Sequence, residues 1–360
     1  MKDLSADPAR TNRPGVEEAA AAIDNQDPAA TAALSAAAAV LKDSLCGRRV
    51  TFVVNRNINF TNVCAVNCLF CGYSVAPDGE GAYLLTYEDA AGKIREALPL
   101  GITEVCMTGG LHPALGLGYL TGMLSAIRES FPGIHIHAFS PMEVHWFARR
   151  EGISVGDVLM RLKDAGLGSM PGTAAEVLVD EVRKVICPGK MDTAQWVEVV
   201  KTAHRMEIKT TATLMFGHIE TAHHIARHLS ILREIQEETG GFTEFVPLPF
   251  IGRRTALRDG TAPQDSARVE RVHAVSRLFF GSLVPNIQVS WTKIGAEAAS
   301  RLLHAGVSDL GGTLIEENIT RLAGGGHGQY MSREELISLI RSQGFDPVER
   351  DTLYTSFVPA

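Results

Sequence analysis

The chain has 360 residues, 45% of them hydrophobic, which is enough for one large barrel-type domain or two ordinary domains. The formal net charge of −7 argues against nucleic acid or an anionic membrane surface as a partner. Six cysteines, three of them clustered, do not suit a disulfide framework, and no apolar run near the N-terminus resembles a signal peptide. We therefore expect a cytoplasmic protein that binds neither membrane nor nucleic acid.

The first 45 residues differ in composition from the remainder of the chain. Residues 1–15 are polar and predict a mobile tail. Alanine dominates residues 16–44, which predicts one or two helices that cap the following domain.

From residue 46 onward, short β-rich segments alternate with helical ones. The predicted strands are 51–59, 103–107, 134–139, 168–171, 209–215, 242–247, 286–291 and 308–313. The predicted helices are 86–98, 117–130, 155–165, 173–185, 193–206, 222–239, 265–280 and 296–304. Eight such units predict an α/β fold, a (β/α)8 TIM-type barrel over residues 46–320, with a doubly wound open sheet as the alternative.

The segment 321–360 is predicted to be a C-terminal extension packed on the barrel. Ser332 and Glu335 form a capping-box pattern at the start of a helix over 332–342, and an extended segment to residue 354 follows. The fourth strand is the weakest prediction, because residues 168–171 are rich in glycine and proline.

Cys64, Cys68 and Cys71 form a C-x-x-x-C-x-x-C motif just after the first predicted strand. Closely spaced cysteines are typical of iron–sulfur ligands, whereas a closed structural zinc site would need a fourth ligand. The alternatives are a zinc site completed by a distant residue, or three unrelated buried cysteines. In a TIM barrel this motif would lie at the C-terminal ends of the strands, where active sites form.

Gly109 and Gly110 follow the second predicted strand at the same end of the barrel. Two glycines allow a ligand to approach the backbone, although an ordinary glycine turn would have the same sequence.

The cysteine motif, with Phe70 before its last cysteine, and the Gly109-Gly110 pair resemble the radical S-adenosylmethionine (SAM) superfamily. The resemblance implies that Cys64, Cys68 and Cys71 hold a [4Fe–4S] cluster whose open iron binds SAM. A donor such as flavodoxin or ferredoxin would reduce the cluster, which cleaves SAM to a 5′-deoxyadenosyl radical. Phe70, Gly109 and Gly110 would then be cofactor-binding residues.

Residues 55–59, 109–113 and 135–143 resemble the branch of this superfamily that processes deazaflavin and futalosine precursors. Within that branch, residues 168–176, 240–250, 286–291, 309–313 and 317–319 are most similar to FO synthase subunit 2. That resemblance implies a transferase that breaks the Cα–Cβ bond of L-tyrosine and joins the 4-hydroxybenzyl group to 5-amino-6-(D-ribitylamino)uracil. FO synthase subunit 1, a second radical SAM enzyme, would complete the deazaflavin FO. The alternatives are a futalosine-pathway relative, a paralogue with another substrate, and a non-catalytic zinc-binding barrel.

Six polar residues are candidate ligands of SAM or the substrates. Ser140 and Glu143 are candidate SAM contacts, with a helix cap and a surface carboxylate as the alternative reading. Glu176, expected at the start of the helix after the fourth strand, is a third candidate for SAM. On the predicted catalytic side, Glu244 is expected to meet the tyrosine ammonium, and Gln288 and Ser290 to bind the pyrimidine.

Overall fold

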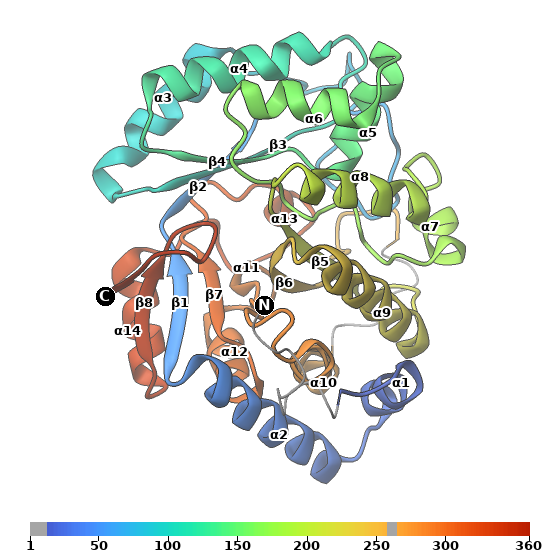
Figure 1. Cartoon of the computed structure of the whole chain (residues 1–360), viewed down its shortest axis with the longest axis vertical. Helices are drawn as coiled ribbons and strands as arrows, with labels where there is room; N and C mark the ends of the chain where they lie inside the picture. The colour runs from blue at the N-terminus through green and yellow to red at the C-terminus, as the bar shows by residue number, and fades with distance from the viewer. Residues whose placement is uncertain (1–12, 258–264) are drawn as a thin grey trace.

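Parallel strands form a closed ring in the computed structural model of this chain, which describes residues 13–257 and 265–360 (Figure 1). The regular strands of the ring are β1 (Arg49–Val53), β2 (Asn55–Asn59), β3 (Glu104–Thr108), β4 (His135–Ala138), β5 (Thr210–Phe216), β6 (Phe242–Pro249) and β7 (Asp309–Gly312). Most of the predicted tail, residues 1–12, lies outside the described residues.

Ladders and single bridges connect these strands in chain order. β2, β3 and β4 pair in parallel, as do β5 and β6, and β7 pairs with β1. Residues 169–170 bridge β4 to β5, residues 287–288 bridge β6 to β7, and a bridge between Arg56 and Ile315 closes the ring. The predicted eight-stranded barrel is confirmed.

Three predicted strands differ from the observed ones. The first, 51–59, divides at Val54 into β1 and β2, because β1 pairs with strand β8 (Asp346–Arg350) while β2 pairs with β3. The fourth and seventh are reduced to bridges. In the fourth, Pro171 has no N–H to donate to a ladder, and just after this strand a Cβ on Gly172 would lie 2.0 Å from the Thr211 carbonyl oxygen.

The C-terminal segment enlarges the sheet at β1. β8 lies parallel to β1, and β9 (Phe357–Pro359) runs antiparallel to β8. Helix α14 (Arg333–Ser342) has the predicted capping box of Ser332 and Glu335. Strand β9 was not predicted.

The helices are α1 (Val16–Asp24), α2 (Pro28–Cys46), α3 (Tyr87–Ala97), α4 (Leu117–Ser130), α5 (Pro141–Glu151), α6 (Val155–Asp164), α7 (Asp180–Ile186), α8 (Thr193–Arg205), α9 (Ala222–Thr239), α10 (Ser266–Phe280), α11 (Trp291–Ile294), α12 (Ala296–Arg301) and α13 (Ile319–Leu322). Most of the helices surround the barrel on its outer side, whereas α11 and α13 are seen inside the outline of the strand ring in Figure 1. Three of these helices, α5, α11 and α13, were not predicted. The helix expected over 173–185 begins only at Asp180, and the α-helix expected over 296–304 ends at Arg301.

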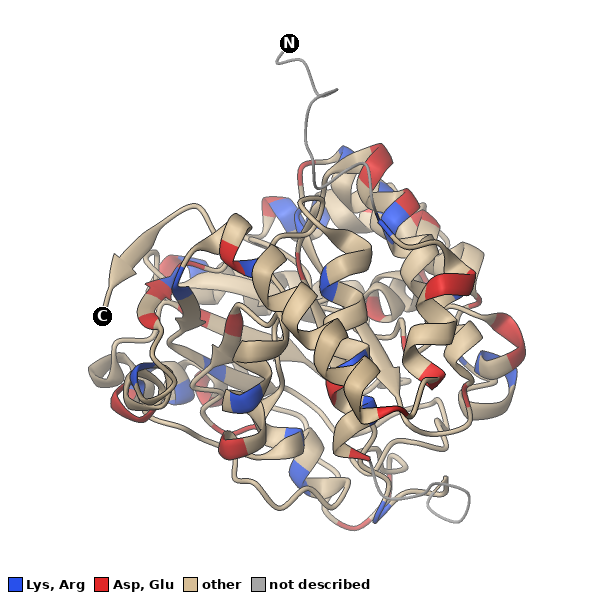
Figure 2. Ribbon diagram, turned by 90° about the horizontal axis from the view of Figure 1, so that it is seen from below, with Lys and Arg blue, Asp and Glu red and all other residues tan. Residues whose placement is uncertain are grey.

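The described residues contain one helix, α2, that is long and apolar enough to span a membrane by length and composition alone. In the fold α2 packs against α10. Its Lys42 is fully buried, donates a hydrogen bond to the Gly47 carbonyl (3.0 Å) and lies 4.0 Å from the centre of the Phe345 ring. Figure 2 shows acidic and basic residues interspersed along the same helices.

Candidate active site

The cysteine loop follows β2 at the C-terminal end of the barrel strands. Backbone hydrogen bonds attach the loop to its surroundings: Cys64 N–H donates to Val75 (3.1 Å), Ala65 N–H to Leu111 (2.9 Å) and Leu69 N–H to Ile186 (2.8 Å). Within the loop, Cys71 N–H donates to the Cys68 carbonyl (3.0 Å). The three thiols are therefore presented by a fixed backbone, and all three are free and half-buried.

Gly109 and Gly110 extend from β3 directly beneath this loop. A Cβ on Gly110 would lie 2.2 Å from the Val63 carbonyl oxygen, and one on Gly109 would lie 2.6 Å from the Phe60 ring. The space at these two Cβ positions is therefore occupied by the protein itself, whereas the backbone of both glycines also lines the cavity described below. The glycines let the cysteine loop pack against the end of β3.

Ser140 and Glu143 form the capping box of α5. Glu143 Oε2 accepts hydrogen bonds from the backbone N–H and the hydroxyl of Ser140, both at 2.7 Å. Its other oxygen, Oε1, accepts from the Gly109 N–H at 3.2 Å. Burial raises the pKa of Glu143 to about 7, although these hydrogen bonds oppose the shift. Glu143 is thus a helix cap, but it is a buried carboxylate and not the surface one of the alternative reading.

Glu176 does not start a helix, as we had expected, but lies in the irregular segment before α7 with a positive φ of 45°. Its carboxylate accepts a hydrogen bond from Lys190 Nζ at 2.6 Å. Burial alone would lower the pKa of Lys190, but the Glu176 carboxylate outweighs it and the pKa is raised. The Lys190 ammonium also lies 5.1 Å from the centre of the Phe70 ring, a cation–π contact.

All these groups line one cavity of about 270 Å³, named here the cysteine cavity. Its wall contains the three cysteines and every residue that we predicted to bind the cofactor, namely Phe70, Gly109, Gly110, Ser140, Glu143 and Glu176. Lys190 and Lys293 also line it. Segments far apart in the sequence therefore meet at the C-terminal end of the barrel.

The donor set of this cavity fits a cluster with one open iron. Its only cysteines are Cys64, Cys68 and Cys71; the others described, Cys46, Cys106 and Cys187, lie elsewhere. Nowhere in residues 13–257 and 265–360 are three His, Cys, Asp or Glu side chains grouped closely enough to hold a single metal ion. In an iron–sulfur cluster each thiolate binds a different iron atom, so the three cysteines need not be as close together as the ligands of a single metal ion. Burial raises the pKa of the unligated Cys68 thiol to about 12.

Lys293, in α11, is a residue of the cavity wall that the sequence did not reveal. Burial lowers its pKa. Among the described residues, no hydrogen bond or ion pair joins its ammonium group, whereas the charge of Lys190 is already paired with Glu176. The Lys293 side chain is half-buried, and an ammonium group partly removed from water without an ion-pair partner costs free energy unless a ligand compensates it.

Glu244 and Gln288 lie outside the cysteine cavity. Glu244 is near the start of β6, where its carboxylate accepts hydrogen bonds from the Tyr354 hydroxyl and from Arg350 (3.4 Å). With its amide oriented so that both atoms find partners, Gln288 donates to Glu244 at 2.8 Å. In a TIM barrel, residues at the N-terminal ends of the strands contribute to stability, whereas active sites lie at the C-terminal ends. These contacts of Glu244 are therefore structural. The substrate-binding roles predicted for Glu244 and Gln288 remain predictions without geometric support.

Ser290 also lies outside the cysteine cavity. It is buried just before α11, and its hydroxyl lies 3.1 Å from that of Thr292. Its assignment to the pyrimidine also remains a prediction.

Comparisons with known proteins agree with this fold and site. The radical SAM superfamily model matches residues 58–232, and a model described as the CofH/MqnC C-terminal region matches residues 239–358. In solved structures, the hydrogenase maturase HydG of Carboxydothermus hydrogenoformans superposes with a TM-score of 0.76 at 17% identity, over 95% of this chain and 78% of HydG. Methylornithine synthase superposes with a TM-score of 0.72 at 15% identity, over 94% of this chain and 95% of the synthase. The fold and the cysteine motif thus define a radical SAM barrel.

Similarity to curated proteins shows which family of the radical SAM superfamily includes this chain. Proteins named 5-amino-6-(D-ribitylamino)uracil–L-tyrosine 4-hydroxyphenyl transferase from Methanopyrus kandleri and Archaeoglobus fulgidus are 50% and 48% identical to this chain. The first match covers 86% of this chain and 85% of the relative, and the second covers 87% and 90%. The chain belongs to this transferase family within the radical SAM superfamily.

Proposed function

We propose that this protein cleaves L-tyrosine at its Cα–Cβ bond and couples the 4-hydroxybenzyl group to 5-amino-6-(D-ribitylamino)uracil, the step that FO synthase subunit 2 performs in deazaflavin synthesis. The observation that carries the proposal is the 50% identity to a relative named for this reaction, over 86% of the chain. The cavity that gathers the three cysteines supports it.

The cysteine cavity is the proposed cofactor site. Cys64, Cys68 and Cys71 would hold a [4Fe–4S] cluster, and SAM would bind beside it along Gly109 and Gly110. Together these groups would supply the one-electron chemistry that breaks the Cα–Cβ bond of L-tyrosine. The enclosing side chains, among them Phe70 and Met142, would exclude water from the reacting groups.

Charged residues of the cavity wall have distinct proposed roles. Glu143 fixes the position of Gly109 through its hydrogen bond. Glu176 and Lys190 neutralise each other and leave Lys293 as the cation available to a substrate. We assign Lys293 to the carboxylate of L-tyrosine, since that carboxylate stays on the two-carbon fragment, 2-iminoacetate, that leaves.

The protein would act with other proteins of the cytoplasm. Its single cysteine triplet suits one of the two radical steps of FO synthesis, so FO synthase subunit 1 would act next on the coupled product. A low-potential donor such as flavodoxin or ferredoxin would supply electrons.

The test is anaerobic reconstitution with iron and sulfide, followed by incubation with SAM, dithionite, L-tyrosine and 5-amino-6-(D-ribitylamino)uracil. We expect a brown protein with about four irons per chain, 5′-deoxyadenosine, and a coupled product of the expected mass. A colourless protein that binds one zinc ion tightly would instead support the non-catalytic alternative. Coupling only to a futalosine-type compound would place the chain in the related menaquinone branch.

A further inference from the structure

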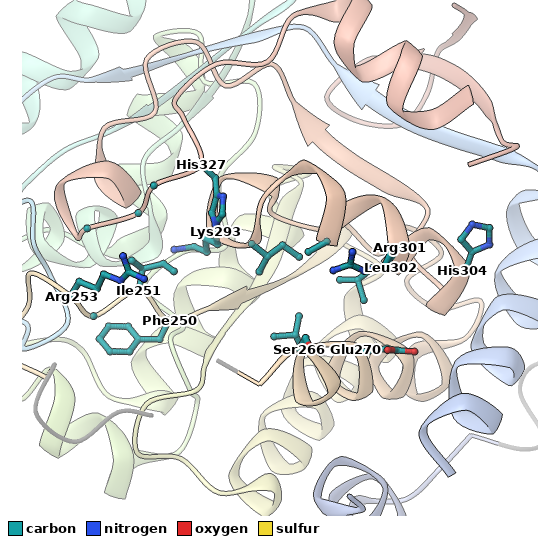
Figure 3. Close-up of a pocket in the computed structure, with 17 residues that line it drawn as sticks. Phe250, Ile251, Arg253, Ser266, Glu270, Lys293, Arg301, Leu302, His304 and His327 are labelled. Carbon is teal, nitrogen blue, oxygen red and sulfur yellow. The ribbon is translucent and has the colours of Figure 1, made fainter. Parts of the chain in front are cut away.

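A second cavity, named here the outer cavity, adjoins the cysteine cavity and has a volume of about 900 Å³ (Figure 3). It lies between the end of β6, the start of α10, helices α11 and α12, and the glycine-rich segment Gly324–His327. Phe250, Ile251 and Lys293 line both cavities. The two spaces therefore share a wall built from only a few side chains.

The lining of the outer cavity combines hydrogen-bond donors with an apolar surface. In Figure 3, Lys293 and His327 lie between Arg253 at one end and Arg301 at the other. The apolar part is formed by aliphatic side chains, namely Val269, Ile294, Ala298 and Leu302. Such a surface suits a ligand that has a flat ring and many acceptor oxygens.

Glycines bring backbone to the edge of this cavity. Gly324 has a φ of +103°, and a Cβ there would lie 2.7 Å from the Arg253 side chain. A Cβ on Gly325 would lie 2.6 Å from Thr320. The glycine-rich segment thus allows the chain to fold closely over Arg253 at the edge of the outer cavity.

The proposed reaction needs two substrates in contact, and one of them, L-tyrosine, is cleaved beside the cysteines. The second must reach that point from an adjoining space, and the wall at Phe250, Ile251 and Lys293 is where the outer cavity meets the cysteine cavity. We propose that the outer cavity binds 5-amino-6-(D-ribitylamino)uracil, with the pyrimidine ring at Phe250 and Ile251 and the ribityl chain toward Arg301. This inference rests on the proposed function.

The test is to reduce the volume of the outer cavity without altering the cysteine cavity. Ala298→Phe places a ring in the outer cavity from α12, and Ala298 does not line the cysteine cavity. Calorimetric titration of the reconstituted holoenzyme with 5-amino-6-(D-ribitylamino)uracil should show at least tenfold weaker binding, and the KM for this substrate should rise equally. The KM values for SAM and L-tyrosine, measured by 5′-deoxyadenosine formation, should stay within twofold of wild type.

Two further variants guard against a folding defect. His327→Ala removes an exposed side chain of the same cavity and should weaken binding of the pyrimidine severalfold. Met160→Phe adds a ring to α6, where Met160 is 48% exposed, and should change nothing.

The outcomes separate the two proposals. If wild-type protein makes the coupled product while Ala298→Phe and His327→Ala bind the pyrimidine as wild type does, the inference is overturned and the proposed function stands. If wild-type protein makes no coupled product from L-tyrosine and this pyrimidine, the proposed function is overturned, and the inference with it.

Discussion

Glu143 accepts a hydrogen bond from the backbone N–H of Gly109 at 3.2 Å, and this contact joins the first turn of α5 to the loop after β3. The same carboxylate caps α5 through Ser140. One buried side chain therefore fixes both the start of a helix and the glycine pair on which SAM is proposed to lie.

Replacing Glu143 by alanine should weaken SAM binding. The loss removes a hydrogen bond to a charged group, worth about 1.5–3 kcal/mol, and frees the Gly109 backbone. Because 1.4 kcal/mol corresponds to a tenfold change, we expect SAM to bind about 10- to 100-fold more weakly. Equilibrium binding of SAM to the reconstituted protein measures this change.

The matched control is Glu335→Ala, which removes the same kind of capping box from α14. It should cost about 1 kcal/mol of stability and leave SAM affinity unchanged. Equal loss of SAM affinity in both variants would mean that Glu143 acts only through helix stability.

Gly110→Ala should disrupt cluster assembly. The new Cβ would meet the Val63 carbonyl oxygen at 2.2 Å, so the cysteine loop must move. We expect iron content after reconstitution to fall at least severalfold. In contrast, Gly92→Ala in α3 meets nothing within 4 Å and should stabilise the protein by about 0.5–1 kcal/mol with full iron content. Full iron content in Gly110→Ala would contradict the packing role assigned to this glycine.

Lys293→Met should raise the KM for L-tyrosine. The variant loses the cation assigned to the substrate carboxylate, a contact worth about 1.5–3 kcal/mol, or about 10- to 100-fold in KM. Lys293→Arg keeps the charge and should recover part of the affinity. Tyramine, which has no carboxylate, provides a sharper comparison: wild type should discriminate strongly against it, and Lys293→Met only weakly. Equal discrimination in the two proteins would remove Lys293 from this role.

The network around Glu244 predicts a pH dependence of stability. Burial raises the pKa of Glu244 to about 7. The charge of Arg350 and the hydrogen bond from Tyr354 oppose this rise, whereas the charges of Asp309 and Glu104 add to it. A raised carboxyl pKa gives stability that is fully present below the unfolded value of 4.5 and is lost as pH rises through about 7. Relative to Glu244→Gln, wild type should therefore lose about 2 kcal/mol of unfolding free energy between about pH 5.5 and 8.

Urea denaturation at several pH values measures this difference. Glu349→Gln, at the more exposed Arg333–Glu349 pair, is the control and should follow the wild-type pH profile. A Glu244→Gln profile parallel to that of wild type would show that Glu244 stays ionised when buried.

The barrel was predictable because its βαβ rhythm is strong, and the cysteine motif because its spacing is specific. Helix α5 was not predicted, although the alternative interpretation of Ser140 and Glu143 as a helix cap is confirmed, and Ser-Pro-x-Glu is a recognisable helix start. Nothing local in the sequence indicates that the same carboxylate reaches Gly109, since that contact depends on how β3 and β4 pair.

The placement of Glu244 illustrates a second limit. Strand alternation indicates which residues face the barrel interior, but the position along the strand decides which end of the barrel they reach. Glu244 is the third residue of the eight-residue strand β6, far from its C-terminal end. Its partners Arg350 and Tyr354 come from the C-terminal segment, whose packing beneath the barrel could not be inferred from local pattern.

The most direct test of the central claim follows the carbon atoms of tyrosine. Reconstituted protein is incubated with SAM, dithionite, 5-amino-6-(D-ribitylamino)uracil and L-tyrosine labelled with ¹³C at either Cβ or Cα, and the products are analysed by mass spectrometry. We predict that the Cβ label appears in the coupled pyrimidine product and the Cα label only in the two-carbon acid. A coupled product that retains the Cα label, or no coupled product while SAM is cleaved, would contradict the assignment.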